Sequence, residues 1–284
     1  MFIMQASGMT DTGRVRSNNE DAFTIQESLL IVADGMGGAA AGEIASSLAV
    51  DIISGDIGDT NMGGHTESEV EHILRKSIVR ADNVIKQKSR ENNELWGMGT
   101  TIVVGCMIDE RMVLGYAGDS RAYVLSRTDK HLVSSQKTPA PSNSPMAETA
   151  ILKPVNDSVI NDSTGTYAIR RITRDHSVVM DLVDSGVINE DDIRTHPMRN
   201  RITRCVGNFR ELGPDFVWYD IDDDDILIMC SDGLWEMVSE EIILAIARSS
   251  STPEEICTRL VSAANDAGGH DNITVVAATF SNQS

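Results

Sequence analysis

Short apolar segments alternate with longer segments of helical spacing along most of the chain. The short segments are rich in β-branched residues and stop at glycines or acidic residues, which predicts strands at 2–6, 22–25, 29–33, 99–105, 112–116, 121–125, 225–230 and 273–280. Apolar positions three and four residues apart predict helices at about 41–54, 67–91, 177–185, 189–194, 239–248 and 253–267. The strands therefore come largely as hairpins, and the longer helices come in pairs.

Acidic residues stand at the ends of several predicted strands. A tight connection at 26–28 predicts an antiparallel hairpin, in which the start of one strand lies beside the end of the other. Glu20 and Asp21 are then expected next to Asp34. By the same geometry Asp271, at the start of the last strand, would lie beside Asp232 if an antiparallel neighbour ended there.

Residues 134–166 differ from the rest of the chain. They contain four of the seven prolines, spaced among Ser, Asn, Thr and Asp. This composition predicts an exposed, mobile insertion, which leads into the segment at 173–205. Residues 1–284 are expected to form a single domain, and 134–166 would be an insertion within it.

Composition narrows the class of protein. A hydrophobic fraction of 41% and a charged fraction of 24% are typical of a soluble globular protein. The net charge of −19 argues against a nucleic-acid partner, because phosphate binding requires a basic surface. No apolar run reaches the roughly 20 residues of a membrane-spanning helix, and residues 1–14 lack the core of a signal peptide. We therefore expect no membrane association and a cytoplasmic location.

The four cysteines do not form a metal-binding pattern. None belongs to a C-x-x-C pair, and Cys106 and Cys230 lie in apolar strand-like runs. A thiolate metal site or a disulfide scaffold is therefore not expected.

The glycine-rich turn at 35–40 matches the G-x-G-x-x-A fingerprint of dinucleotide-binding proteins. That fingerprint places a pyrophosphate at a helix N-terminus, where Asp34 would add an unfavourable negative charge. The next periodic segment is also a helix and not the second strand that a nucleotide-binding unit requires. The pattern therefore argues against a dinucleotide site.

Five short acidic turns form the candidate chemical site: Glu20-Asp21, Asp34-Gly35, Asp119, Asp232-Gly233 and Asp271. Each alone is typical of a turn-stabilising carboxylate. Several carboxylates at one edge of a strand bundle, however, repel one another unless cations lie between them. Oxygen ligands without thiolate favour Mg²⁺ or Mn²⁺, and a carboxylate bridging two such ions can activate water and brace a phosphoryl group.

Seven motifs in order resemble those of the metal-dependent protein phosphatases of the PP2C type, in their bacterial form, over nearly the whole chain except 134–166. They are R-x-x-x-E-D at 16–21, A-D-G-M-G-G at 33–38, G-T-T at 99–101, G-D-S-R at 118–121, T-R-D-H-S at 173–177, S-D-G-L at 231–234 and G-H-D-N at 269–272. The resemblance implies an α+β fold in which a central sandwich of two antiparallel β-sheets is flanked by pairs of antiparallel helices. It also implies that 173–205 forms a flap beside the active site.

The resemblance further implies two Mn²⁺ or Mg²⁺ ions, with a possible third. Asp34 corresponds to the ligand that bridges the two ions, and the Gly35 carbonyl corresponds to a ligand of the second ion. Asp232 and Asp271 correspond to ligands of the first ion. Asp119, together with Asp232, corresponds to the third site.

Other residues of the turns correspond to supporting roles. Glu20 matches the residue that holds a metal-bound water, with Asp21 in support, and Arg16 matches the arginine that grips the substrate phosphate. Some relatives have a histidine where this chain has Met36, and that histidine is thought to protonate the leaving group. Met36 cannot do so, which leaves His270, water or another group as the acid.

The implied function is hydrolysis of phosphoserine or phosphothreonine in proteins by a metal-bridging hydroxide, in opposition to a Ser/Thr kinase. The protein is expected to act as a monomer on phosphorylated protein substrates. A phosphohydrolase acting on a small phosphorylated metabolite is an alternative. A non-catalytic metal-binding regulatory module is another, although such a module has no evident need for five mutually repelling acidic positions and Arg16.

Overall fold

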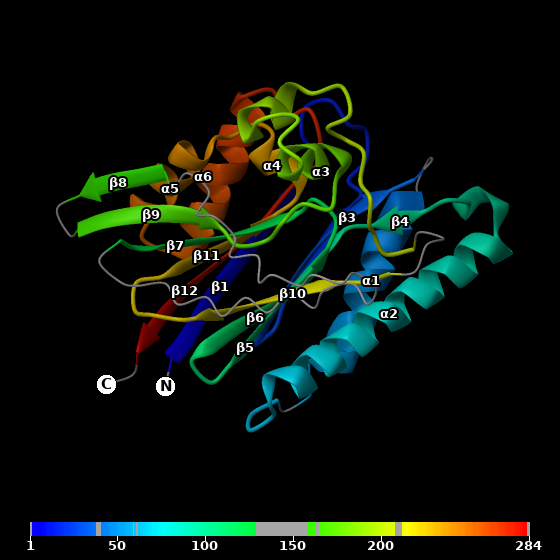
Figure 1. Ribbon diagram of the computed structural model, residues 1–284, viewed down its shortest axis with the longest axis horizontal. Coiled ribbons are helices and arrows are strands. Elements are labelled where there is room, and N and C mark those ends of the chain that lie inside the picture. Colours follow the sequence, from blue (N-terminus) through cyan, green and yellow to red (C-terminus); the bar gives the residue numbers. More distant parts are fainter. Residues whose placement is uncertain are drawn as a thin grey trace.

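The chain forms four layers, in the order helix pair, sheet, sheet, helix pair (Figure 1). The computed structural model describes residues 2–37, 41–58, 60, 62–128, 158–162, 165–207 and 212–282. Both sheets are built from antiparallel neighbours. The predicted fold class, a two-sheet antiparallel sandwich flanked by helices, is confirmed.

The first sheet has the strand order β1-β12-β11-β7-β9-β8. Its strands are β1 (Phe2–Asp11), β7 (Arg121–Arg127), β8 (Ser158–Asp162), β9 (Gly165–Arg171), β11 (Ile226–Cys230) and β12 (Ile273–Asn282). The second sheet has the order β10-β6-β5-β3-β2, and β4 pairs separately with β3. Its strands are β2 (Asp21–Ile25), β3 (Leu29–Met36), β4 (Gly99–Thr100), β5 (Ile102–Ile108), β6 (Arg111–Ala117) and β10 (Asp215–Asp220).

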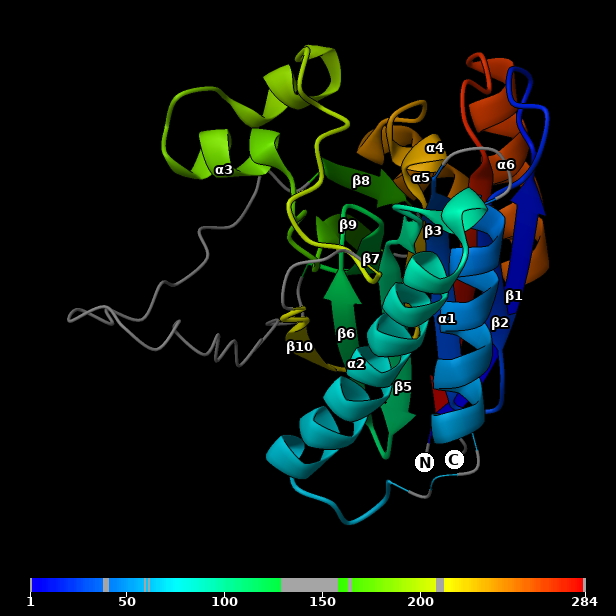
Figure 2. The same cartoon turned by 90° about the vertical axis from the view of Figure 1, so that its right-hand side faces the viewer.

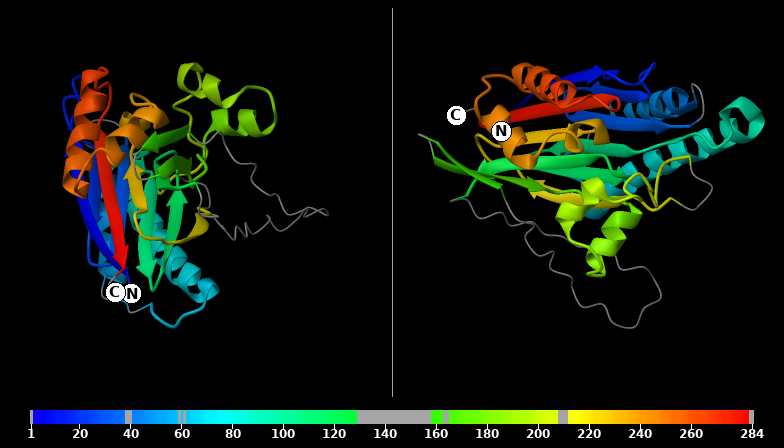
Figure 3. Two further views of the ribbon diagram at one scale, coloured as in Figure 1. Left: turned by 90° about the vertical axis from the view of Figure 1, so that its left-hand side faces the viewer. Right: turned by 90° about the horizontal axis from the view of Figure 1, so that it is seen from above.

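Two long helices, α1 (Ala41–Ile57) and α2 (Glu67–Glu91), cover the second sheet, as Figure 2 shows. The first sheet is covered by α5 (Glu240–Arg248) and α6 (Pro253–Asp266), whose orange helices lie beside the red β12 in the left view of Figure 3. Short helices are α3 (Val178–Asp184), α4 (Asp232–Trp235) and the 3₁₀ turns Asn93–Leu95 and Glu190–Thr195. Residues 173–205, which include α3 and the second 3₁₀ turn, are called the flap segment below.

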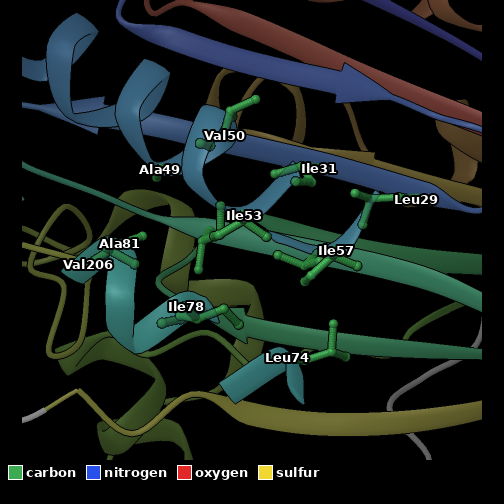
Figure 4. Close-up of a cluster of buried hydrophobic side chains, with 14 of the residues drawn as sticks. Leu29, Ile31, Ala49, Val50, Ile53, Ile57, Leu74, Ile78, Ala81 and Val206 are labelled. Carbon is green, nitrogen blue, oxygen red and sulfur yellow. The ribbon is translucent and has the colours of Figure 1, made fainter. Parts of the chain in front are cut away.

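Three buried clusters separate the four layers, and β3 belongs to two of them. Leu29 and Ile31 face α1 and α2, whereas Leu30 and Val32 face the other sheet. This alternation follows from the two-residue period of a strand. Figure 4 shows the helix side of this arrangement, where side chains of α1, α2 and β3 share one cluster. Because both of its faces are packed, β3 provides a rigid support for the residues at its end.

The strand boundaries differ from the predicted ones where tertiary pairing extends them. β3 continues to Met36 because Gly35 and Met36 pair with Thr100 and Gly99 of β4. The first strand reaches Asp11 because it pairs with β12 along its whole length. Pairing with a distant strand is not visible in a local apolar pattern.

The predicted insertion at 134–166 lies partly outside the described residues, which omit 129–157 and 163–164. At its end, β8 and the start of β9 form a hairpin that the sequence analysis did not predict. β8 is the outer strand of its sheet, and β10 is a further strand that the sequence pattern did not predict.

Two predictions from composition can be compared with the structure. All four cysteines are free and buried, in agreement with the absence of a disulfide scaffold. Among the helices within the described ranges, none combines the length and the apolar character needed to cross a membrane.

Candidate metal centre

Asp34 lies within β3, directly opposite Asp21 of β2. The predicted neighbourhood of these two carboxylates is therefore correct. The backbone of Asp34 is held from the β4–β5 side: its N–H donates to Thr101 Oγ1 at 3.0 Å. Its carbonyl accepts from the Thr101 N–H at 2.8 Å and from Thr100 Oγ1 at 2.9 Å. These bonds fix the position from which the Asp34 side chain leaves the strand.

Asp232 and Asp271 lie just outside the neighbouring strands β11 and β12, which pair antiparallel. Asp232 opens helix α4 immediately after Ser231, and Asp271 precedes β12. The Ser231 hydroxyl connects the two sheets at this end: it accepts from the Thr274 N–H at 2.9 Å and donates to Asp21 Oδ2 at 2.7 Å. Carboxylates from both sheets therefore meet at one end of the sandwich, where α4 lies in Figure 1.

Asn272 attaches the loop between β1 and β2 to this end. Its side chain is buried, accepts the Glu20 N–H at 2.9 Å and donates to the carbonyls of Thr12 and Asn18 at 3.0 and 2.8 Å. Arg16, in the same loop, donates from Nη2 to Asp271 Oδ2 at 2.6 Å, and half of its side chain is exposed. The sequence motif included Asn272 but did not reveal this structural role.

Asp119 lies in the turn between β6 and β7 and is 4% exposed. Its carbonyl accepts the Trp235 Nε1–H at 3.0 Å. The preceding Gly118 is held by His176 through two bonds, from Gly118 N–H to Nδ1 at 3.2 Å and from His176 N–H to the Gly118 carbonyl at 2.8 Å. In the described part of the chain, Asp119 Oδ1 is buried without a hydrogen-bond partner. Such an orphaned carboxylate oxygen is suited to a cation.

Two glycines allow helix α1 to touch β3 at the site. The Gly35 N–H donates to the Glu20 carbonyl at 3.1 Å. A Cβ added at Gly42 of α1 would lie 2.7 Å from Glu20 Oε2 and 2.8 Å from the Gly35 carbonyl oxygen. Only a residue without a side chain leaves this space free. The importance of Gly42 could not be recognised from a helical spacing pattern.

Burial and repulsion by neighbouring acids raise the pKa values of Asp21, Asp34, Asp119 and Asp232. Loss of solvation is the main cause for Asp34, whose pKa lies well above the usual range, and the charges of Asp21, Asp232, Asp119 and Asp271 raise it further. Burial is also the main cause for Asp21, with a pKa of about 6, and for Asp119, with a pKa of about 7. The pKa of Asp232 is raised well above its normal value in the same way. The acids therefore act on one another electrostatically, as expected of a cation site.

Glu236 is a further acid at this end that the sequence analysis missed. It follows Asp232 by four residues, and its charge raises the pKa of both Asp232 and Asp119. Its Oε1 also contacts Arg199 Nε of the flap segment at 3.5 Å. A helix that begins at Asp232 places residue 236 on the same helix face as Asp232. The sequence pattern, however, did not predict a helix there.

The donor set fits hard divalent ions. Across the described ranges no three acidic, histidine or cysteine side chains lie close enough together to enclose an ion by themselves. Mg²⁺ commonly takes only one or two carboxylates and completes its shell with water. Carboxylates, the Gly35 carbonyl and water can therefore share the ligand positions, with Asp119 Oδ1 available for a further ion.

The contacts of Met36 and His270 do not identify a leaving-group acid. Met36 has no ionisable proton, and its Cγ would contact a side chain added at Gly99. His270 is exposed, and its Nε2 lies beside Gly268. A role of His270 as the acid stays a prediction.

In the metal-free protein, we expect the melting temperature to fall by several degrees between pH 4 and pH 7. Asp21 and Asp119 have raised pKa values, about 6 and about 7, against 3.8 when unfolded. Their protonated forms stabilise the folded state below pH 3.8, and this contribution is lost as the pH rises through the folded values. Thermal unfolding in the presence of a chelator measures the effect. Saturating Mn²⁺ should remove most of the decrease; a flat profile without metal would contradict the proposed repulsion.

The sequence matches the profile of one protein family, protein phosphatase 2C, at residues 5–143 and 214–273. It is 32% identical to the serine/threonine phosphatase stp of Listeria monocytogenes over 278 residues, which cover 96% of this chain and 94% of that protein. It is 30% identical to the protein phosphatase PhpP of Streptococcus pneumoniae, with 96% of both chains covered.

Solved structures show the same similarity. The Mycobacterium tuberculosis serine/threonine phosphatase PstP/Ppp superposes with a TM-score of 0.76 at 30% identity, covering 98% of each chain. A catalytic domain of the serine/threonine protein phosphatase PstP in complex with two manganese ions has a TM-score of 0.76 at 28% identity, covering 99% of this chain and all of that one.

Proposed function

Because this chain belongs to the protein phosphatase 2C family, we propose that Asp34, Asp232 and Asp271 bind two divalent metal ions and that the Gly35 carbonyl is a further ligand. The chain is a metal-dependent protein serine/threonine phosphatase. The observation that best supports the ligand set is that both sheets deliver carboxylates to one end of the sandwich, where Asp21 lies opposite Asp34 and accepts a hydrogen bond from Ser231, the residue before Asp232. Asp34 would be shared between the two ions, as the family resemblance implies, and its carboxylate is close enough to Asp232 and Asp271 for both charges to raise its pKa.

The remaining acids support this arrangement. Glu20, whose N–H donates to Asn272 and whose side chain lies close to Gly42, would hold a metal-bound water. Asp21, opposite Asp34, supports it. Asp119 and Asp232 bind a possible third ion, for which the orphaned Asp119 Oδ1 is the supporting observation.

Arg16 binds the phosphoryl group of the substrate. Its guanidinium is anchored on Asp271 through Nη2 while half of the side chain remains exposed. The hydrogen bond to Asp271 is the main cause that raises the Arg16 pKa, so the group stays charged. A planar guanidinium with several donors is suited to phosphate oxygens. Arg16 thus positions the phosphate next to the carboxylate cluster and neutralises part of its charge.

The bound ions supply Lewis-acid charge and lower the pKa of water, so that a nucleophile is available at neutral pH. The protein residues position the reactants and stabilise charge, which accounts for most of the rate enhancement in such transfers. The leaving serine or threonine oxygen needs a proton. Met36 cannot provide it, so His270, water or another group acts as the acid.

Further aspects of the function are proposed from the relatives. Relatives named serine/threonine phosphatases imply phosphorylated protein substrates. We propose a cognate Ser/Thr kinase, a monomeric state and a cytoplasmic location. A small-metabolite phosphohydrolase and a non-catalytic module are not favoured, since the similar proteins are named as protein phosphatases.

Phosphate release tests the substrate class directly. With Mn²⁺ present, we expect turnover of a phosphothreonine peptide at least about tenfold faster than that of the matched phosphotyrosine peptide or of sugar phosphates, because specific contacts to the peptide add binding free energy in the transition state. Chelator should abolish the activity. Equal or faster turnover of a sugar phosphate would support the metabolite phosphohydrolase, and no turnover of any substrate would support the non-catalytic module.

A further inference from the structure

We propose that Asp82 of helix α2 is a positioning residue for the metal centre. It holds the chain at the end of the flap segment and, through Thr100, the backbone of Asp34. This inference rests on the proposed role of Asp34 as a metal ligand. Within the described ranges, Asp82 bonds to Gly207 and Lys86 and not to the acids of the site, so its effect would pass through the intervening backbone.

Asp82 is a buried carboxylate with two partners. Only 3% of the residue is exposed. Its Oδ1 accepts the Gly207 N–H at 2.8 Å, and its Oδ2 accepts Lys86 Nζ at 2.6 Å. Hydrogen bonds to an ionised acceptor are about twice as strong as neutral ones, particularly away from water. Asp82 therefore forms a strong, directional attachment between α2 and the chain just beyond the flap segment.

The backbone conformation of Gly207 and its lack of a side chain allow its N–H to donate this hydrogen bond. Its φ of +89° is favourable for glycine and strained for other residues. A Cβ at this position would lie 2.4 Å from Ile85 Cγ2 and 3.0 Å from the Met98 carbonyl oxygen. The chain can thus approach α2 closely enough for its N–H to reach Asp82.

The next links lead to Asp34. Val206 is fully buried, in the same cluster as Ala81 and Ile78 in Figure 4. Its N–H donates to the Thr100 carbonyl at 2.8 Å, and its carbonyl accepts the Thr100 N–H at 2.9 Å. Thr100 Oγ1 in turn donates to the Asp34 carbonyl at 2.9 Å. An unbroken series of hydrogen bonds and peptide units therefore joins Asp82 to the proposed bridging ligand.

The same attachment restrains the flap segment, because its two ends are paired. Ser177 forms a bridge with Ile202, and the Thr203 N–H donates to the His176 carbonyl at 2.7 Å. His176 also holds Gly118, next to Asp119. Release of the Gly207 end would consequently loosen the flap base on both sides, near Asp34 and near Asp119.

Packing of α2 does not require a charge at this position. Val70, Leu74, Ile78, Ala81 and Ile85 already form a fully buried apolar stripe on the helix. A buried ion pair is weak evidence for stability, since desolvation offsets most of the attraction. The specific contribution of Asp82 is therefore the orientation of the Gly207 peptide.

Three variants separate positioning from stability. Asp82→Ala removes the attachment. The double variant Asp82→Asn with Lys86→Gln keeps an oxygen for the Gly207 N–H and replaces the buried ion pair by a neutral amide pair. Ser77→Ala is the matched control, because Ser77 is a buried polar residue of the same helix that bonds to Asp56 of α1 instead of the flap end.

Amide hydrogen exchange in the metal-free protein and calorimetric Mn²⁺ titration are the readouts. Loss of a charge-assisted hydrogen bond corresponds to about tenfold or more in an equilibrium constant. We therefore expect Asp82→Ala to exchange about tenfold faster at 203–207 and at Thr100, and to bind Mn²⁺ about tenfold more weakly. The double variant should restore both values to within about threefold of wild type, and Ser77→Ala should leave them unchanged.

The outcomes distinguish this inference from the assignment of the site. Wild-type exchange and Mn²⁺ affinity in Asp82→Ala, with loss of Mn²⁺ binding in Asp34→Ala, would overturn the positioning role alone. Unchanged Mn²⁺ binding in Asp34→Ala would overturn the proposed ligand set, while faster exchange at 203–207 in Asp82→Ala would still establish the attachment. Equal effects of Asp82→Ala and Ser77→Ala would show general destabilisation of α2 and contradict the proposal.

Discussion

Asp34→Ala is expected to lower phosphate release from a phosphothreonine peptide by about a thousandfold or more and to abolish tight Mn²⁺ binding. Removal of one preorganised electrostatic group typically costs about a hundredfold to a thousandfold in kcat, and Asp34 is proposed to serve two ions at once. The loss should appear mainly in kcat and should not be recovered by excess Mn²⁺. Steady-state kinetics with Mn²⁺ titration measures it.

The same variant should be more stable than wild type when metal is absent. Asp34 is a buried carboxylate whose pKa is raised by loss of solvation and by four other acids, so its ionised form destabilises the metal-free fold. Thermal unfolding in the presence of a chelator tests whether the variant is indeed more stable than wild type. Asp51→Ala, at an exposed position of α1, is the control and should change neither activity nor stability appreciably. An Asp34→Ala protein with wild-type turnover would contradict the site.

Gly42→Ala is expected to reduce kcat/KM about a hundredfold at low Mn²⁺. The added methyl would lie 2.7 Å from Glu20 Oε2 and 2.8 Å from both the carbonyl carbon and the oxygen of Gly35. Backbone at this distance must shift, and displacement of catalytic groups by about 1 Å can cost a hundredfold in rate. Since the Gly35 carbonyl is a proposed ligand, higher Mn²⁺ should recover part of the activity.

Gly55→Ala provides the matched comparison for this prediction. Gly55 lies in the same helix, is exposed and has no atom within 4 Å of an added Cβ. It should therefore gain roughly 0.5–1 kcal/mol in stability from improved helix propensity and retain full activity. Full activity at all Mn²⁺ concentrations in Gly42→Ala would show that close contact between α1 and β3 is unnecessary for the site.

Local patterns were sufficient for most of the fold. The apolar stripe of α2 predicted its bounds at 67–91, and the tight turn at 26–28 predicted the β2–β3 hairpin that pairs Asp21 with Asp34. Both rest on interactions between residues close in sequence, where periodicity and turn chemistry are informative. Strand β10 was not predicted because its partner β6 is distant in the chain. β8 was missed because it lies in the segment whose composition indicated an insertion, although its partner β9 is adjacent. Helix α4 is too short to show a periodic pattern.

Some residues of the candidate site could be recognised from the sequence, and others only from the structure. Asp34, Asp119, Asp232, Asp271, Glu20 and Arg16 could be singled out because acidic turns and ordered motifs are visible in the chain. Glu236 could not be singled out, since its position near Asp232 depends on helix α4. That helix is too short to show a periodic sequence pattern. Asn272, Gly42 and Asp82 likewise resemble ordinary loop or helix residues until their contacts are known.

The sequence by itself determined the chemical type of this protein: oxygen donors in recurring turns, no C-x-x-C pair for a thiolate metal site, and an arginine that we propose to bind phosphate. Identity of side chains and local spacing carry that information. Only the tertiary structure decided how the turns are brought together and held, through Ser231 between the sheets, Asn272 on the Glu20 loop and Asp82 at the end of the flap segment. These contacts join residues far apart in the chain, and their geometry exists only once both sheets and their helices have packed.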